Sequence, residues 1–299
     1  MKKPAELSVL SPSDISSQGP VKYWIDGKFV DQRDASIPLT DLAIVRGYAA
    51  FDALRTYGNT PFLLDAHLKR LEETCAFLHL KPPLDRANMA RAVLATVRTN
   101  NFAESLIRIY VTGGEASGLI PEHKERLIIL VDSLRTYPPQ QYEKGIALAT
   151  TTLNRTLPLA KSTDYVAGIR ETVRARHNGF DEVVFLDRQS NILEGTTFSV
   201  VVVRGRDLIS PADGVLRGIT VDHVLGLASQ AGLRGRRAAI PPDLLDEADE
   251  VFVTSSVREV VPVVRIDTKR IAGGLPGPIT CHLHKLYCES ARSICSQGL

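Results

Sequence analysis

The hydrophobic and polar positions of the chain predict strands and helices that are mixed along its whole length. In the first half, apolar residues at helical spacing predict helices over residues 65–80, with Asp65 as the cap, and over residues 84–100. Period-two alternation, apolar runs and an Asp-Gly turn predict the strands 21–25, 28–30, 49–57, 105–112 and 126–134.

The second half repeats this mixture after a short proline-rich interruption at residues 138–142. Helices are predicted at about 164–178, at 220–231 and from residue 280 onward, and the strands are predicted at 146–151, 182–186, 192–203, 207–209 and 250–254. We therefore expect a two-domain α+β (α/β) fold with a ligand site in the cleft between the domains. The predicted division is a flexible arm (1–20), a small α/β domain (21–137), a linker (138–145) and a large domain (146–299).

Composition narrows the class of protein. The 299 residues are 44% apolar, and 36 basic residues nearly balance 34 acidic ones, so neither a nucleic-acid partner nor an anionic membrane surface is indicated. No segment approaches the run of about 18 apolar residues that spans a bilayer, and no secretory signal is evident, so we expect a cytoplasmic protein.

The four cysteines do not form a disulfide framework for a chain of this length. Cys281, Cys288 and Cys295 recur every seven residues, which places them along one helical face with His284 between two of them. That spacing allows a metal site, but free cysteine is usually a small buried apolar side chain, and we expect no metal.

Lys161 is the first candidate for chemistry. It lies among apolar residues in the segment 157–164, immediately before a predicted helix. Partial burial would lower the pKa of its ammonium group, and a neutral amine can attack a carbonyl to form a Schiff base. The competing interpretation is a lysine that extends its charged end to water, which for a lone lysine is the more common case.

Glu194 is the second candidate, because it lies in an otherwise small and apolar stretch, 192–198. A carboxylate there is costly unless it has a cationic or hydrogen-bonding partner. A protonated pyridine nitrogen would serve, and so would one of the many arginines of the chain. The sequence leaves both interpretations open.

Two short segments have the features of a phosphate site. Residues 216–220 (Leu-Arg-Gly-Ile-Thr) place free backbone N–H groups and a hydroxyl at the start of a predicted helix, where the helix dipole favours an anion. Residues 254–256 (Thr-Ser-Ser) end a predicted strand and could complete the same pocket. Each feature alone is also compatible with an ordinary helix cap.

Taken in order, these segments resemble the class-IV aminotransferases, the family of branched-chain and D-amino-acid transaminases and of aminodeoxychorismate lyase. The motifs extend over about residues 21–290 and are 46–55, 67–71, the Lys161 segment, 179–187, 194–197, 216–220, 248–256 with Glu259, and 273–278. One departure is Ser199, where many relatives have asparagine, and this puts in doubt any role of that amide.

The resemblance implies pyridoxal 5'-phosphate (PLP) as cofactor, a fold type IV architecture, a homodimer and a ping-pong mechanism. Lys161 would form the Schiff base and move the proton between Cα and C4′, and Glu194 would hold the pyridine nitrogen. The residues implied to bind the cofactor are Arg70, Lys161, Tyr165, Glu194, Thr196, Thr197, Leu216, Gly218, Ile219, Thr220, Ser255 and Ser256.

Two arginines are candidates for binding substrate. Arg46 stands where branched-chain and many D-amino-acid enzymes carry an aromatic residue, and arginine grips a carboxylate by two parallel hydrogen bonds. We hypothesise that Arg46 helps to bind the substrate α-carboxylate, as in a D-amino-acid-transaminase subgroup that its motif resembles. An inter-subunit salt bridge is the alternative. Arg108 is a second candidate in the same cleft.

Three functions are compatible with these features. The first is a transaminase that moves the amino group of a branched-chain L-amino acid or a D-amino acid to a 2-oxo acid such as 2-oxoglutarate. The second is a PLP-dependent aminodeoxychorismate lyase, which releases pyruvate. The third, a non-enzymatic binding protein, is disfavoured because Lys161, Glu194, Arg70 and both phosphate segments occur together.

Overall fold

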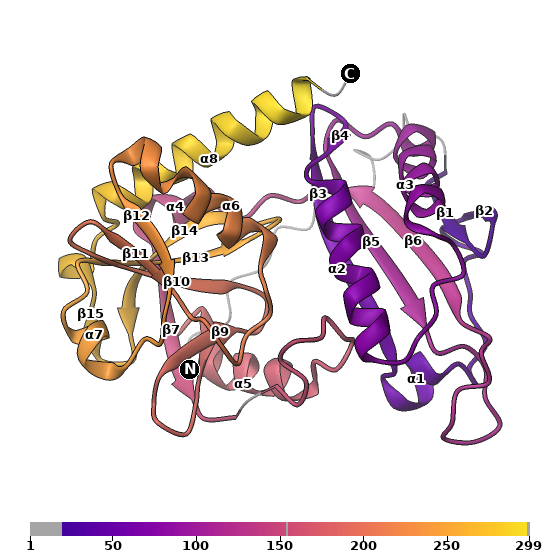
Figure 1. The fold of residues 1–299 in the computed structure, drawn as a ribbon, viewed down its shortest axis with the longest axis horizontal. Coiled ribbons are helices and arrows are strands. Elements are labelled where there is room, and N and C mark those ends of the chain that lie inside the picture. Colours follow the sequence, from indigo (N-terminus) through magenta and orange to yellow (C-terminus); the bar gives the residue numbers. More distant parts are fainter. Residues whose placement is uncertain (1–19, 154, 298–299) are drawn as a thin grey trace, which may run out of the picture.

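Strands and helices are mixed in both halves of the molecule, as the sequence predicts, and they form two sheets that lie side by side (Figure 1). The computed structural model describes residues 20–153 and 155–297. Residues 1–19 of the predicted N-terminal arm lie outside the described part. Among the helices that are described, none combines the length and apolar character needed to cross a membrane.

The first sheet has six antiparallel strands in the order β2-β1-β6-β5-β3-β4, and all of them come from residues before 134. Its elements are β1 (Lys22–Ile25), β2 (Lys28–Asp31), α1 (Leu42–Arg46), β3 (Ala49–Tyr57), β4 (Thr60–Pro61), α2 (Leu64–Phe77), α3 (Arg86–Asn100), β5 (Ser105–Thr112) and β6 (Arg126–Ser133).

Helices α2 and α3 cover one face of this sheet because alternate residues of the strands are apolar. Ile107 and Ile109 of β5 are fully buried and pack in one core with Leu68 and Leu71 of α2 and Val93 of α3. Fully burying a side chain of this kind contributes about 1.5–3 kcal/mol. This packing fixes α2 on the sheet and so determines where its polar residues point.

The second sheet has nine strands in the order β12-β11-β10-β13-β14-β7-β8-β9, with β15 paired to β14. Its elements are α4 (Pro139–Lys144), β7 (Ile146–Thr151), α5 (Val166–His177), β8 (Glu182–Leu186), β9 (Ile192–Gly195), β10 (Ser199–Arg204), β11 (Asp207–Ser210), α6 (Ile219–Leu227), η2 (Ala228–Ala231), β12 (Arg234–Arg237), α7 (Pro242–Asp246), β13 (Glu250–Ser255), β14 (Glu259–Ile266), β15 (Lys269–Arg270), η3 (Ala272–Gly274) and α8 (Pro278–Ser296).

Helix α8 connects the two parts of the molecule. It runs along the second sheet and its C-terminal end reaches the β3–β4 turn of the first (Figure 1). Tyr57 and Phe62, from the first part, share one core with Leu283 and Tyr287 of α8. The two parts are therefore joined by buried apolar contacts as well as by the chain between β6 and β7.

Several predicted boundaries differ from the structure. Asp65 does not cap α2, which begins at Leu64 after Leu63 in the left-handed conformation (φ 52°), and α2 ends at Phe77 rather than at residue 80. Helix α8 begins at Pro278, two residues earlier than predicted, because proline is favoured in the first turn of a helix. The predicted linker, 138–145, contains the short helix α4.

Candidate active site

A cavity lies between the two sheets, and both parts of the molecule contribute to its walls. Its walls are β3, α2, the loop before α5, the β9–β10 turn, the N-terminus of α6 and the β13–β14 turn. All twelve residues predicted to bind the cofactor line this cavity, and they are Arg70, Lys161, Tyr165, Glu194, Thr196, Thr197, Leu216, Gly218, Ile219, Thr220, Ser255 and Ser256.

Lys161 enters the cavity from the loop before α5. Its backbone is held from both sides, since Lys161 N donates to Thr74 Oγ1 (3.3 Å) and Phe51 N donates to Lys161 O (2.9 Å). Its Nζ lies 4.7 Å from the centre of the Phe51 ring. Burial lowers the pKa of Lys161 to about 8, and the positive charge of Arg70 adds to this effect. A substantial fraction of the amine is therefore neutral near that pH.

Glu194 lies on β9 and is only 6% exposed. Its Oε1 accepts a hydrogen bond from Arg155 Nη1 (2.9 Å), and its Oε2 accepts one from Leu216 N (3.2 Å). Burial raises the pKa of Glu194 above its ordinary value, although the charge of Arg155 opposes the shift. Glu194 thus has an arginine partner, which was one of the two interpretations of its sequence. Both Glu194 and Arg155 line the cavity.

Arg155 is a site residue that sequence reasoning did not single out. Besides its pair with Glu194, it donates from Nη2 to the carbonyl of Ala160 (2.7 Å), the residue before Lys161. One guanidinium therefore ties together the two segments that carry Lys161 and Glu194. Arginine is abundant in this chain, and Arg155 is 39 residues from Glu194 in the sequence. No local sequence pattern therefore identifies Arg155 as the partner of Glu194.

The cavity also has the chemistry of an anion site. Helix α6 begins at Ile219 without a side-chain cap, so its first N–H groups face the cavity. A Cβ on Gly218 would come within 2.5 Å of Ser199 Oγ, so a larger residue would crowd the approach. Thr254 Oγ1 is buried there with no hydrogen-bond partner in the described structure. These donors fit a phosphate group.

Aromatic and hydroxyl side chains complete the walls. Tyr165 immediately precedes α5 and packs edge-on against Phe51, with ring centres 5.8 Å apart. Burial raises the pKa of Tyr165, which keeps its hydroxyl protonated as a hydrogen-bond donor. Thr196, in the β9–β10 turn, lies within hydrogen-bond distance of Thr172 on α5 (3.1 Å). The walls are thus fixed by contacts with β3 of the first sheet and with α5 of the second part.

The two arginines predicted to bind substrate lie outside the residues that line the cavity. Arg46 is exposed at the end of α1 and donates to the carbonyl of Val45 (2.7 Å). Arg108, on β5, pairs with Asp132 (2.5 Å). The cross-strand neighbour of Arg108 is Ala53 of β3, which lines the cavity. Their role toward substrate stays a prediction.

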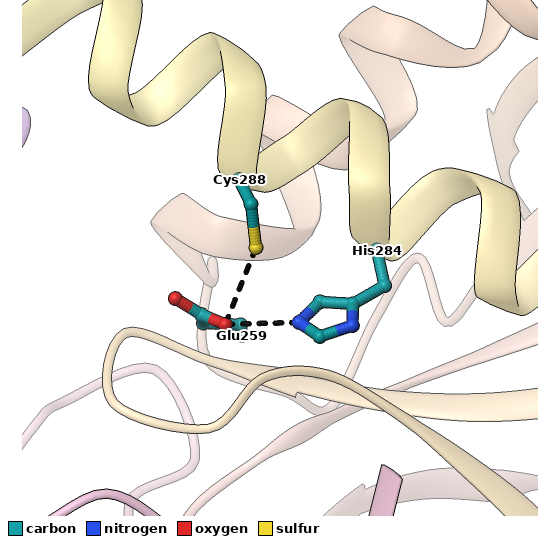
Figure 2. A group of neighbouring side chains, drawn as sticks. All are labelled: Glu259, His284 and Cys288. Atoms are coloured by element: carbon teal, nitrogen blue, oxygen red, sulfur yellow. Dashed lines mark hydrogen bonds and ion pairs between the residues drawn. The ribbon is translucent and has the colours of Figure 1, made fainter. Parts of the chain in front are cut away.

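A second polar cluster joins the two parts of the molecule at Glu259, three residues after Ser256. Its Oε1 accepts hydrogen bonds from Tyr57 Oη (2.7 Å) and Arg55 Nη1 (2.9 Å) of β3. Its Oε2 lies 2.9 Å from His284 Nε2 and 3.4 Å from Cys288 Sγ, both on α8. Figure 2 shows both α8 side chains pointing at this carboxylate.

Within the described residues, Glu259, His284 and Cys288 form the grouping whose donor atoms are close enough to share a metal ion. Arg55, however, already places its positive charge on the same carboxylate. We therefore interpret the cluster as an ion-pair and hydrogen-bond network. The expectation of a buried cysteine face holds for Cys295 but not for Cys281, which is exposed.

Replacing Glu259 with glutamine is expected to destabilise the protein by roughly 2–4 kcal/mol, because Arg55 would remain buried without its charge partner. Burial alone would raise the pKa of Glu259. The hydrogen bonds from His284 and Tyr57 and the charge of Arg55 outweigh that effect and lower the pKa to about 2 from an ordinary 4.5. Its contribution is therefore complete above pH 4.5 and is lost as pH falls toward 2.

Chemical denaturation of both proteins at a series of pH values measures this effect. The difference in unfolding free energy should narrow as the pH is lowered through that window. Asp246→Asn, which removes an exposed partner of Lys269, is the control and should change stability little. A Glu259→Gln variant as stable as the wild type at neutral pH would contradict the interpretation.

Known proteins share this fold and sequence pattern. The family model described as amino-transferase class IV matches residues 49–266, well over half of the chain. The branched-chain-amino-acid aminotransferase of Pseudomonas aeruginosa is 30% identical over 280 residues, covering 89% of this chain and 91% of the relative. The D-alanine aminotransferase of Bacillus licheniformis is 27% identical over 293 residues, covering 92% and 100%.

A solved structure agrees with these sequence relatives. The T.th. branched-chain amino acid aminotransferase, crystallised with pyridoxamine 5'-phosphate, superposes with a TM-score of 0.86 at 27% identity and covers 93% of this chain and 96% of that one. The matched fold and sequence define the family. This chain belongs to the class-IV aminotransferases, and it is an aminotransferase; none of these relatives supports the lyase alternative.

Proposed function

We propose that the protein is a PLP-dependent transaminase that moves the amino group of a branched-chain L-amino acid or a D-amino acid to a 2-oxo acid such as 2-oxoglutarate. The observation that carries the proposal is the placement of Lys161 in one cavity with Glu194 and an anion site. The substrate classes rest on relatives that are named for branched-chain amino acids and for D-alanine.

The side chains and backbone donors of the cavity match the charged and polar groups of PLP. Arg70, the N-terminus of α6 and the hydroxyls at 254–256 would bind the phosphate, while Glu194 would face the pyridine nitrogen. The bound cofactor supplies an aldehyde for covalent capture of the amine and an electron sink for the bonds at the substrate Cα. Lys161 would hold that aldehyde carbon in the resting enzyme.

The chain itself would handle the proton of the reaction. Lys161 Nζ can accept a proton from the substrate Cα, because the pKa of about 8 leaves it partly neutral, and can return it in the same active site. Arg155 would keep Glu194 ionised, and Phe51 and Tyr165 would restrict water on one side of the cavity. In the first half of the cycle, an amino acid would leave its amino group with the enzyme and depart as its 2-oxo acid. In the second half, a different 2-oxo acid would take up that amino group and depart as its amino acid.

A homodimer in the cytoplasm is part of the same proposal. In the part of the chain that the structure describes, helix α5 carries an exposed apolar stripe, where Val166, Ile169 and Val173 are 77%, 58% and 49% exposed. Their spacing of three and four residues places them on one helix face. Covering such a stripe with a second subunit would remove apolar surface from water, and the unpaired cysteines are compatible with a reducing compartment.

The proposed function is tested with purified protein loaded with PLP and a panel of D- and L-alanine, glutamate, leucine and valine. We expect one enantiomeric series to change the absorbance of the bound cofactor and to yield the matching 2-oxo acid. Release of pyruvate from aminodeoxychorismate alone would instead support the lyase. Within this panel, the hypothesis for Arg46 predicts a raised KM in Arg46→Ala, and an unchanged KM would reject it.

A further inference from the structure

A buried carboxylate lies directly behind the cavity wall and has no role in the function so far. Asp52, on β3, is fully buried, and it faces α2. Both of its oxygens are engaged: Oδ2 accepts from Arg70 Nε (2.9 Å), and Oδ1 accepts from Arg70 Nη2 (2.8 Å). His67 Nδ1, one helical turn before Arg70, lies 2.8 Å from the same Oδ1.

This arrangement makes Asp52 an ionised anchor. Burial alone would raise the pKa of Asp52, but the charge of Arg70 and the hydrogen bond with His67 hold it well below its ordinary range. A buried carboxylate is tolerated only with such partners. Because His67 and Arg70 are three residues apart on α2, one carboxylate contacts both from a single direction.

The two-pronged contact determines how Arg70 enters the cavity. Asp52 takes the edge of the guanidinium formed by Nε and Nη2, and a planar fork of this kind fixes orientation as well as position. The remaining Nη1 donates to the carbonyl of Arg217 (3.1 Å), next to the uncapped start of α6 at Gly218. Arg70 is thus held by the first sheet and aimed at the anion site built by the second.

We propose that Asp52 is a positioning residue for the phosphate site, acting through Arg70. The proposal rests on the proposed PLP function and concerns how strongly the phosphate group of that cofactor is bound. Asp52 does not line the cavity itself. An Asp52→Asn side chain has nearly the same shape, but its amide N–H₂ would oppose one of the guanidinium donors, so the two-pronged contact would be lost.

The test compares PLP with pyridoxal, which lacks the phosphate but keeps the aldehyde and the ring. Dissociation constants of both compounds are measured by absorbance and fluorescence titration of the apoprotein. In Asp52→Asn we expect PLP to bind at least about tenfold more weakly, while pyridoxal binding is nearly unchanged. Glu72→Gln is the matched control, because Glu72 lies on α2 like Arg70 but pairs with Arg86 of α3 and lies outside the cavity wall.

Arg70→Lys provides the second variant. If Asp52 acts through Arg70, then adding Asp52→Asn to Arg70→Lys should weaken PLP binding no further, because the fork is already absent. Equal losses for PLP and pyridoxal, or additive losses in the double variant, would overturn the proposal and indicate a general structural role. A wild-type protein that captures neither compound would instead reject the proposed function, so the two failures are distinguishable.

Discussion

Replacing Lys161 with alanine is expected to lower the transamination rate by about 10⁴-fold, because the variant would lose both the amine proposed to hold the cofactor and the base proposed to move the proton. The fold should persist, since the side chain of Lys161 makes no hydrogen bond in the described structure and its segment is held by backbone contacts. The measurement is the rate of each half-reaction with a saturating amino donor.

Lys161→Arg is the matched control, because it keeps a positive charge in the same place but cannot supply a neutral amine. It should be as inactive as the alanine variant. In the wild type, the rate at which apoprotein captures PLP should rise with pH and level off above about 8, since the neutral fraction of Lys161 rises through that pKa. An active Lys161→Ala enzyme would contradict the assignment.

Replacing Glu194 with glutamine is expected to lower the rate by about 10²- to 10³-fold, the size of effect seen when one preorganised electrostatic contact is removed from a reacting group. The carboxylate would no longer stabilise a protonated pyridine nitrogen, so the electron sink would weaken. Arg155 would then be left without its anionic partner. Single-turnover kinetics and cofactor affinity should be measured together, because the effect is expected mainly in the chemical step.

Glu171→Gln is the control for this change. Glu171 is also a buried glutamate of the second part and pairs with Arg174, but it lies outside the cavity wall. The control should retain near-normal turnover even if it loses some stability. A Glu194→Gln enzyme with wild-type turnover would mean that this carboxylate only balances the charge of Arg155.

The sequence predicts those parts of the fold that have a regular local pattern. The apolar spacing predicts strands such as β5 and helices such as α3. It does not predict strand β14, because Pro262 interrupts the apolar run of this strand and has no N–H to donate to a neighbouring strand. Strand β12 is only four residues long and contains arginine and glycine, so its pairing with β11 depends on contacts distant in sequence.

The residues of the candidate site also divide into those that local sequence predicts and those that it does not. Lys161, Glu194 and Thr220 lie in local segments whose composition indicates chemistry, and the structure brings all three to one cavity. Arg155 and Asp52 act on site residues 39 and 18 positions away. Such contacts are set by how the sheets pack, which no pattern within a short window of sequence records.

Chemical reduction shows whether Lys161 holds PLP covalently. Sodium borohydride fixes the cofactor to the lysine that carries it, and peptide mass spectrometry then locates the added pyridoxyl group. We expect the modification on the peptide that contains Lys161, at one group per chain, and its loss in Lys161→Ala. An unmodified Lys161, or a label on another lysine, would show that Lys161 does not hold the cofactor.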